Sequence, residues 1–216
     1  MPSRDPSPPI VLQRATHPLP IDLVAAAAVL LAATVAIGLF WPAPPFEVAF
    51  LLWIRDTFGN SLDGLMLVMD DVGDVGTVSI VLLTMVGLVA LRWGLRPAAA
   101  VFITGLAALL LNIGIKLLVG RPRPGLWIEA DSSYSLPSGH VLLFSVLVLL
   151  TYEWWPWDRW RGHMAAVGFL LVCLMGFSRL YLGEHYPTDV LAGLSIAILL
   201  WAGYRKVRSR SQTAAE

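Results

Sequence analysis

Several side chains that can carry out proton transfer or bind anions stand at the ends of apolar runs in this sequence. They are Lys116, Arg121, Arg123, Ser138, His140, Arg179, His185 and Asp189. A positive charge at bilayer depth costs about 2.5–3.5 kcal/mol on insertion scales, so such residues usually have a partner. If Lys116 or Arg179 stood alone, its long side chain could simply reach the lipid headgroups with its charged end. Their convergence instead predicts a cationic pocket with two imidazoles and one carboxylate.

Basic groups that converge in this way suit the oxygens of a phosphate, because arginine offers paired donors and lysine a point charge. In the stretch "SLPSGHVLL", Ser138 is expected to cap a helix, whose first backbone N–H groups then point outward. Gly139 has no side chain, so an anion could approach that backbone closely. We therefore expect the start of this helix to bind phosphate.

The two histidines suit proton transfer or nucleophilic attack. His140 would lie within reach of a bound phosphate ester, although a lone histidine there could simply be wetted by lipid headgroups. His185 and Asp189 are four residues apart at the start of a helix, so the carboxylate could orient the imidazole. Asp189 could also stabilise the helix dipole, by about 0.3–1 kcal/mol.

Three motifs in order resemble one family. "KLLVGRPRP" fits Lys, six residues, Arg-Pro; "PSGH" follows; and "SRLYLGEHYPTD" fits Ser-Arg, five residues, His, three residues, Asp. From about residue 62 to 204 the chain resembles the type 2 phosphatidic acid phosphatase (PAP2) family, and in particular bacterial membrane lipid phosphatases of the undecaprenyl-diphosphatase kind. This family shares its site with vanadium haloperoxidases and bacterial acid phosphatases.

The resemblance implies a role for each matching residue. His185 would attack phosphorus to give a phosphohistidine, Asp189 would hold its ring, and His140 would protonate the leaving oxygen and later activate water. Phosphate would be bound by the remaining motif residues, namely Lys116, Arg123, Ser138, Gly139 and Arg179. The resemblance also implies that neither a metal nor another cofactor is needed.

Two further charged features fall outside the motifs. Arg121 is expected to be either a contact at the rim of the site or a solvated charge. The acidic group Asp70, Asp71 and Asp74 could argue for a metal such as Mg²⁺, but three carboxylates before a span more often form a solvated outer rim.

The elements that must position these residues are membrane helices. Of the 216 residues, 57% are hydrophobic and only 14% are charged, against roughly 25% in soluble domains. Windows of about 20 residues, the length that crosses a bilayer, predict an all-α protein with six transmembrane helices and a core bundle of the PAP2 and vanadium-haloperoxidase kind. The six spans are expected at 21–41, 75–92, 97–118, 138–155, 163–181 and 187–204.

The rest of the chain is divided among shorter segments. We expect a disordered leader at 1–20, an amphipathic interfacial segment at about 44–60, an active-site loop at about 119–137 and a basic tail at 205–216. With the amino terminus inside, ten of the fifteen Lys and Arg residues fall on the inner side. This predicts a bacterial cytoplasmic-membrane protein with both termini in the cytoplasm and its site facing outward.

A lipid phosphate entering from the bilayer is the expected partner, with no nucleic acid. Undecaprenyl pyrophosphate is preferred over phosphatidylglycerol phosphate and phosphatidic acid, although apolar walls discriminate lipid tails by only about 1–3 kcal/mol per feature. A lipid phosphotransferase would share every motif, and a non-enzymatic lipid-binding bundle would tolerate loss of His185. The predicted spans argue against a soluble haloperoxidase.

Overall fold

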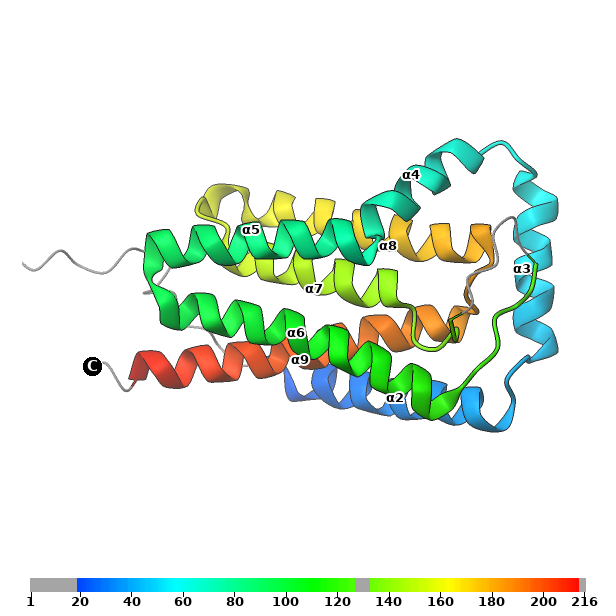
Figure 1. Cartoon of the computed structure of the whole chain (residues 1–216), viewed down its shortest axis with the longest axis horizontal. Coiled ribbons are helices and arrows are strands. Elements are labelled where there is room, and N and C mark those ends of the chain that lie inside the picture. Colours follow the sequence, from blue (N-terminus) through cyan, green and yellow to red (C-terminus); the bar gives the residue numbers. More distant parts are fainter. Residues whose placement is uncertain (1–18, 127–132, 214–216) are drawn as a thin grey trace, which may run out of the picture.

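The computed structural model describes residues 19–126 and 133–213, and within these ranges every regular element is helical. Nearly all of the expected leader at 1–20 and part of the expected active-site loop at 119–137 lie outside the described residues. Six helices run roughly along the long axis of the molecule (Figure 1). They are α2 (Ile21–Phe40), α5 (Val75–Trp93), α6 (Leu95–Val119), α7 (Gly139–Trp154), α8 (Arg161–Leu182) and α9 (Pro187–Thr213).

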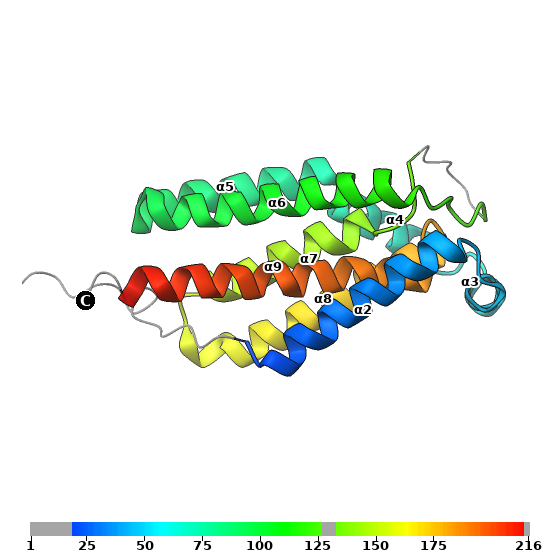
Figure 2. The ribbon, with the colours of Figure 1, turned by 90° about the horizontal axis from the view of Figure 1, so that it is seen from below.

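Three shorter elements complete the described chain. Helix α3 (Pro45–Phe58) lies across one end of the bundle and is seen end-on in the second view (Figures 1 and 2). It matches the expected interfacial segment in position, while its place at a membrane surface stays a prediction. Helix α4 (Asp63–Gly73) leads back from α3 toward α5, and the 3-10 turn η1 (Asp158–Trp160) precedes α8.

The long helices have the length and surface of membrane spans. Among the described residues, five are long and apolar enough to cross a bilayer: α2, α5, α6, α9 and the continuous segment of η1 and α8. Large apolar side chains cover their outer surfaces; Leu91 is 88% exposed and Leu95 is 80% exposed. Such surfaces are costly in water and are matched by lipid. The chain is therefore an all-α, multi-pass membrane protein.

Helix α7 differs from the fourth predicted span, at 138–155. Its 16 residues reach about 24 Å at 1.5 Å per residue, less than the roughly 30 Å of a bilayer core. It packs against α5, α6, α8 and α9, and its buried residues join the main hydrophobic core. It can be short because its first residue lies inside the bundle, where the polar residues of the other helix ends meet it.

Two glycines end helices immediately before important side chains. Gly120 follows α6 with φ +62°, and Gly183 follows α8 with φ +55°, both in the left-handed region that favours glycine. These turns direct Arg121 and Glu184 back over the end of the bundle.

Candidate active site

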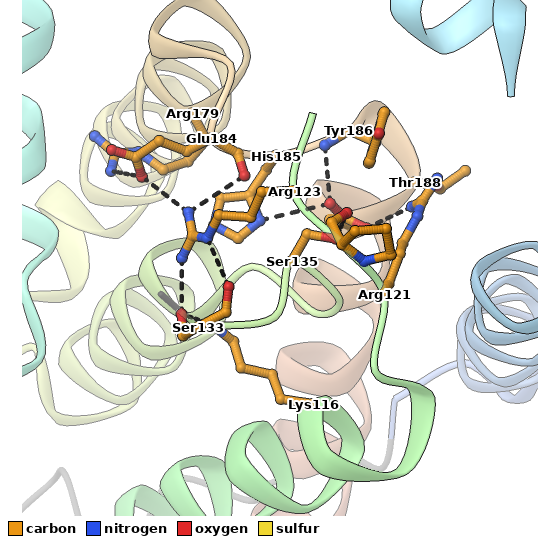
Figure 3. Close-up of polar contacts among 12 residues, drawn as sticks. Lys116, Arg121, Arg123, Ser133, Ser135, Arg179, Glu184, His185, Tyr186 and Thr188 are labelled. Carbon is orange, nitrogen blue, oxygen red and sulfur yellow. Dashed lines mark hydrogen bonds and ion pairs between the residues drawn. The ribbon is translucent and has the colours of Figure 1, made fainter. Parts of the chain in front are cut away.

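The site lies at the end of the bundle that α3 crosses. The last turns of α6 and α8 meet the first turns of α7 and α9 there, so residues far apart in sequence become neighbours (Figures 1 and 3). The structure thus brings the predicted residues to one end of the molecule.

His185 lies in the turn between α8 and α9 and is only 1% exposed. Its Nδ1 atom is 3.5 Å from Asp189 Oδ2, which is longer than the usual N–H···O hydrogen bond. Burial lowers the pKa of His185 to about 4; Asp189 opposes this shift, whereas the positive charges of Arg123 and Lys116 add to it. The imidazole is therefore neutral near pH 7 and keeps a lone pair on one nitrogen.

Asp189 is held from both sides. Its Oδ2 atom accepts a hydrogen bond from the Tyr186 backbone N–H at 2.8 Å, and its Oδ1 atom accepts one from Arg121 Nη1 at 2.5 Å. The carboxylate is fully buried, so these donors replace the water that it loses. Asp189 is thus fixed next to His185 by the first turn of α9 and by Arg121.

Arg121 is neither a rim contact nor a solvated charge, so both alternatives expected from the sequence are wrong. Its side chain is completely buried and lies 4.1 Å from the centre of the Tyr186 ring. Besides Asp189, it donates to Glu47 Oε2 at 2.6 Å, to Thr188 Oγ1 at 2.7 Å and to the Pro42 carbonyl at 2.8 Å. Two buried carboxylates balance its charge, which explains how it can lie away from water.

Lys116 and Arg123 converge on one hydroxyl group. The Ser133 Oγ atom lies 3.1 Å from Lys116 Nζ and 2.9 Å from Arg123 Nη2 (Figure 3). Arg123 Nε also donates to the Ser133 carbonyl at 3.0 Å, and its Nη1 atom lies 3.4 Å from Glu184 Oε2. Both residues are half-buried and meet at the same hydroxyl group, so the structure brings them together as the sequence predicts.

Arg179 is completely buried near the end of α8 and contacts two carboxylates. Its Nη1 atom donates to Asp70 Oδ1 and lies 3.2 Å from Glu184 Oε2. The same Asp70 oxygen is 3.1 Å from His140 Nε2. Asp70 is therefore part of the site rather than of a solvated rim, which corrects the expectation for this residue.

The other two acids of that group behave differently. Asp71 is exposed, and Asp74 caps α5 by accepting a hydrogen bond from the Gly76 N–H at 2.7 Å. Within residues 19–126 and 133–213, no group of three or more His, Cys, Asp and Glu side chains is placed to hold a metal ion.

Ser138 stands at the N-cap position of α7, as expected, but its hydroxyl makes no capping bond. The Oγ atom is buried without a hydrogen-bond partner, whereas the backbone N–H of Ser138 donates to the Asp189 carbonyl at 3.0 Å. Gly139 packs so closely that an added Cβ atom would lie 3.0 Å from Asn112 Nδ2. The start of α7 thus combines free helix-end polarity with an unpaired buried hydroxyl, a combination suited to binding an anion.

The site carries more negative charge than the sequence indicates. Three carboxylates join Asp189, and together they bind Arg121, Arg123 and Arg179; these additional residues are Glu47, Asp70 and Glu184. Glu184 had a signal in the sequence, since it precedes His185 within the third motif. Glu47 had none, and the acidic group that contains Asp70 suggested a solvated rim, because both residues reach the site only through the packing of α3 and α4.

Comparison with known proteins now decides the family. A family model described as the PAP2 superfamily matches residues 96–212, more than half of the chain. The chain belongs to the PAP2 superfamily. The matched region includes all three motifs but begins after Glu47 and Asp70.

Named relatives in the PAP2 superfamily match over shorter regions. Phosphatidylglycerophosphatase B of Bacillus subtilis is 33% identical over 98 residues, which are 43% of this chain and 48% of that protein. Undecaprenyl-diphosphatase BcrC of the same organism is 35% identical over 107 residues, 45% of this chain and 51% of that protein. The chain thus spans about half the length of these two relatives.

A solved structure supports the fold. The crystal structure of a transmembrane PAP2 type phosphatidylglycerolphosphate phosphatase from Bacillus subtilis superposes with a TM-score of 0.73 at 20% identity. The match covers 88% of this chain and 96% of the other. The predicted PAP2 core bundle is therefore confirmed.

Proposed function

We propose that this protein is a membrane lipid phosphatase that removes the terminal phosphate of a lipid pyrophosphate or phosphate through a phosphohistidine. The observation that carries the proposal is the buried, neutral His185 beside Asp189, with Lys116 and Arg123 nearby. A neutral imidazole can donate a lone pair, and positive neighbours can bind the phosphate that it attacks.

In the first step, the nitrogen of His185 that faces away from Asp189 forms a bond to phosphorus. The bond between phosphorus and the lipid oxygen breaks, and that oxygen takes a proton from His140. Asp189 balances the positive charge that develops on the His185 ring, at a distance of 3.5 Å.

In the second step, a water oxygen attacks phosphorus while its proton passes to His140. The bond between phosphorus and nitrogen breaks, so inorganic phosphate leaves and His185 regains its lone pair. Basic side chains and the start of α7 bind the equatorial oxygens in both steps; they are Lys116, Arg123, Arg179, Ser138 and the Gly139 N–H.

The proposed substrate is undecaprenyl pyrophosphate, with phosphatidylglycerol phosphate or phosphatidic acid as the alternative. Relatives named for the first two activities support both classes, and the lipid-facing helix surfaces support a substrate whose tail stays in the bilayer. A lipid phosphotransferase would use the same site but pass the phosphate to an acceptor hydroxyl.

We also propose that the site faces the outside of a bacterial cell. The opposite end of the bundle carries eight basic residues of the described chain, and positive charge concentrates on the cytoplasmic side. These residues are Arg92, Arg96, Arg159, Arg161, Arg205, Lys206, Arg208 and Arg210.

The test is phosphate release by purified protein in EDTA from undecaprenyl pyrophosphate, phosphatidylglycerol phosphate and phosphatidic acid. His185→Ala should abolish turnover, because it removes the nucleophile. The matched control is His163→Ala, which removes an exposed histidine at the other end of the bundle and should leave the rate unchanged. Retained turnover in His185→Ala would rule out the phosphohistidine, and transfer of phosphate to an added alcohol in preference to water would favour the transferase.

A further inference from the structure

One oxygen of Asp70 contacts two side chains of the site that belong to different helices. Asp70 Oδ1 is 3.1 Å from His140 Nε2 on α7 and also accepts a hydrogen bond from Arg179 Nη1 on α8. The carboxylate comes from α4, which precedes the region matched by the PAP2 model. Asp70 therefore lies outside the motifs that define the site in the sequence, although both of its partners belong to them.

The helix that carries Asp70 is fixed at both ends. Near its beginning, Asp63 Oδ1 accepts a hydrogen bond from the Tyr181 hydroxyl of α8 at 2.6 Å. At its end, Gly73 packs against the site so closely that an added Cβ atom would lie 2.8 Å from His140 Cδ2 and 2.6 Å from Met175 Cε. Such close packing leaves the imidazole little room to turn away from Asp70.

The charge of Asp70 settles the direction of the hydrogen bond to His140. The His140 contact, together with Arg179, holds the pKa of Asp70 well below its usual range, although burial opposes this. An ionised carboxylate only accepts hydrogen bonds, so His140 Nε2 must carry the hydrogen. Among the described residues, the charged groups around the imidazole are Asp70 from α4 and Arg179 from α8, and Glu184 contacts the same Arg179 Nη1 atom that donates to Asp70.

We propose that Asp70 is a positioning residue for phosphate transfer, which holds His140 and Arg179 together and fixes the orientation of the His140 ring. The inference rests on the proposed function, in which His140 gives a proton to the leaving oxygen. Asp70 itself exchanges no proton. It keeps the acid ready for the first step and the guanidinium aimed at the phosphate.

A purely structural ion pair is the competing explanation, and Asp70→Asn separates the two. This change keeps the size of the side chain but removes its charge. The matched control is Asp71→Asn, which removes the same charge from the exposed neighbour on α4. Both variants are assayed on the lipid that wild-type protein hydrolyses fastest, with kcat and KM measured from acid to alkaline pH.

We expect Asp70→Asn to lower kcat by about 10- to 100-fold, less than the 10²–10⁴-fold that a general acid supplies. The alkaline limb of its kcat profile should also move to lower pH, because the imidazolium loses its counter-ion. Asp71→Asn should match wild type in both. In a His140→Asn background, adding Asp70→Asn should lower kcat by a smaller factor than it does in wild type, since only the effect that passes through Arg179 remains.

Folding is checked by thermal unfolding with and without tungstate, an anion that mimics phosphate. Tungstate should still raise the unfolding temperature of Asp70→Asn. If that variant does not fold, Asp70→Glu replaces it, and it should keep the wild-type alkaline limb at a lower rate because the charge is retained. An unshifted pH profile, or a rate equal to that of Asp71→Asn, would overturn the role of Asp70 alone. No phosphate release by wild type from any of the three lipids would overturn the proposed function, and this inference with it.

Discussion

At the scale of single residues, the arginines of the site are already bound to carboxylates. Arg121 lies between Glu47 and Asp189, and Arg179 lies between Asp70 and Glu184. A phosphate bound at the proposed site would therefore have to compete with acidic side chains of the protein itself. These carboxylates lower the cost of holding arginines in a poorly hydrated region, but they also weaken the attraction for anions.

Glu184 is the carboxylate best placed to compete with phosphate. Its Oε2 atom is 3.4 Å from Arg123 and 3.2 Å from Arg179, and its side chain is only 16% exposed. Glu184→Gln should therefore lower the inhibition constant of inorganic phosphate by roughly 3- to 10-fold, the equivalent of about one partly screened ion pair.

The measurement is inhibition of lipid hydrolysis by phosphate at fixed ionic strength, with Asp71→Asn as a variant of equal charge change. An inhibition constant for Glu184→Gln that is equal to or higher than that of Asp71→Asn would show that Glu184 does not compete with phosphate.

Sequence reasoning placed the motif residues at one end of the bundle because their spacing coincides with the ends of apolar runs. It failed for Arg121, whose burial depends on Glu47, a residue 74 positions away. It also failed for Asp70, which the pattern of neighbouring acids suggested was solvated. Both failures have one cause: a charge is buried only where another segment supplies its partner, and single-chain periodicity does not report such pairs.

At the scale of elements, the short helices α3 and α4 each supply an acidic side chain to the site. Glu47 connects α3 to the first turn of α9, because its Oε1 atom accepts a hydrogen bond from the Thr188 N–H at 2.8 Å while Oε2 binds Arg121. Sequence patterns located α3 but could not show that its single buried acid completes the site. They also overestimated the length of α7, since an apolar run does not reveal where a helix begins inside a bundle.

We predict that Glu47→Gln destabilises the protein. The change removes a charge that is fully buried against Arg121, and breaking such a pair costs up to about 3–5 kcal/mol in the free energy of unfolding. The cost should be smaller than this upper value, because Arg121 still forms its ion pair with Asp189 in the variant. Thermal unfolding in detergent should show a lower midpoint for Glu47→Gln than for Asp56→Asn, which removes an exposed acid from the same helix. Equal midpoints would mean that the pair contributes no net stability.

At the scale of the whole molecule, the sequence predicted the fold well because membrane helices follow from length and hydropathy alone. Five long apolar helices and the matched PAP2 structure confirm this architecture. The direction in which the bundle crosses the membrane is a separate question. The proposed direction rests on the basic residues at the end opposite the site, because positive charge concentrates on the cytoplasmic side of membrane proteins.

Orientation can be measured with one cysteine at each end. Gly64, at the start of α4, and Gly162, at the start of α8, are both exposed helical residues at which a Cβ atom meets nothing within 4 Å. Each is changed to cysteine after Cys173, which is exposed, has been replaced by serine. A membrane-impermeant maleimide should label Gly64→Cys in intact cells, and Gly162→Cys only after the cells are permeabilised. The reverse pattern would place the phosphate site on the cytoplasmic side, and the proposed substrate would then have to be available in the inner leaflet.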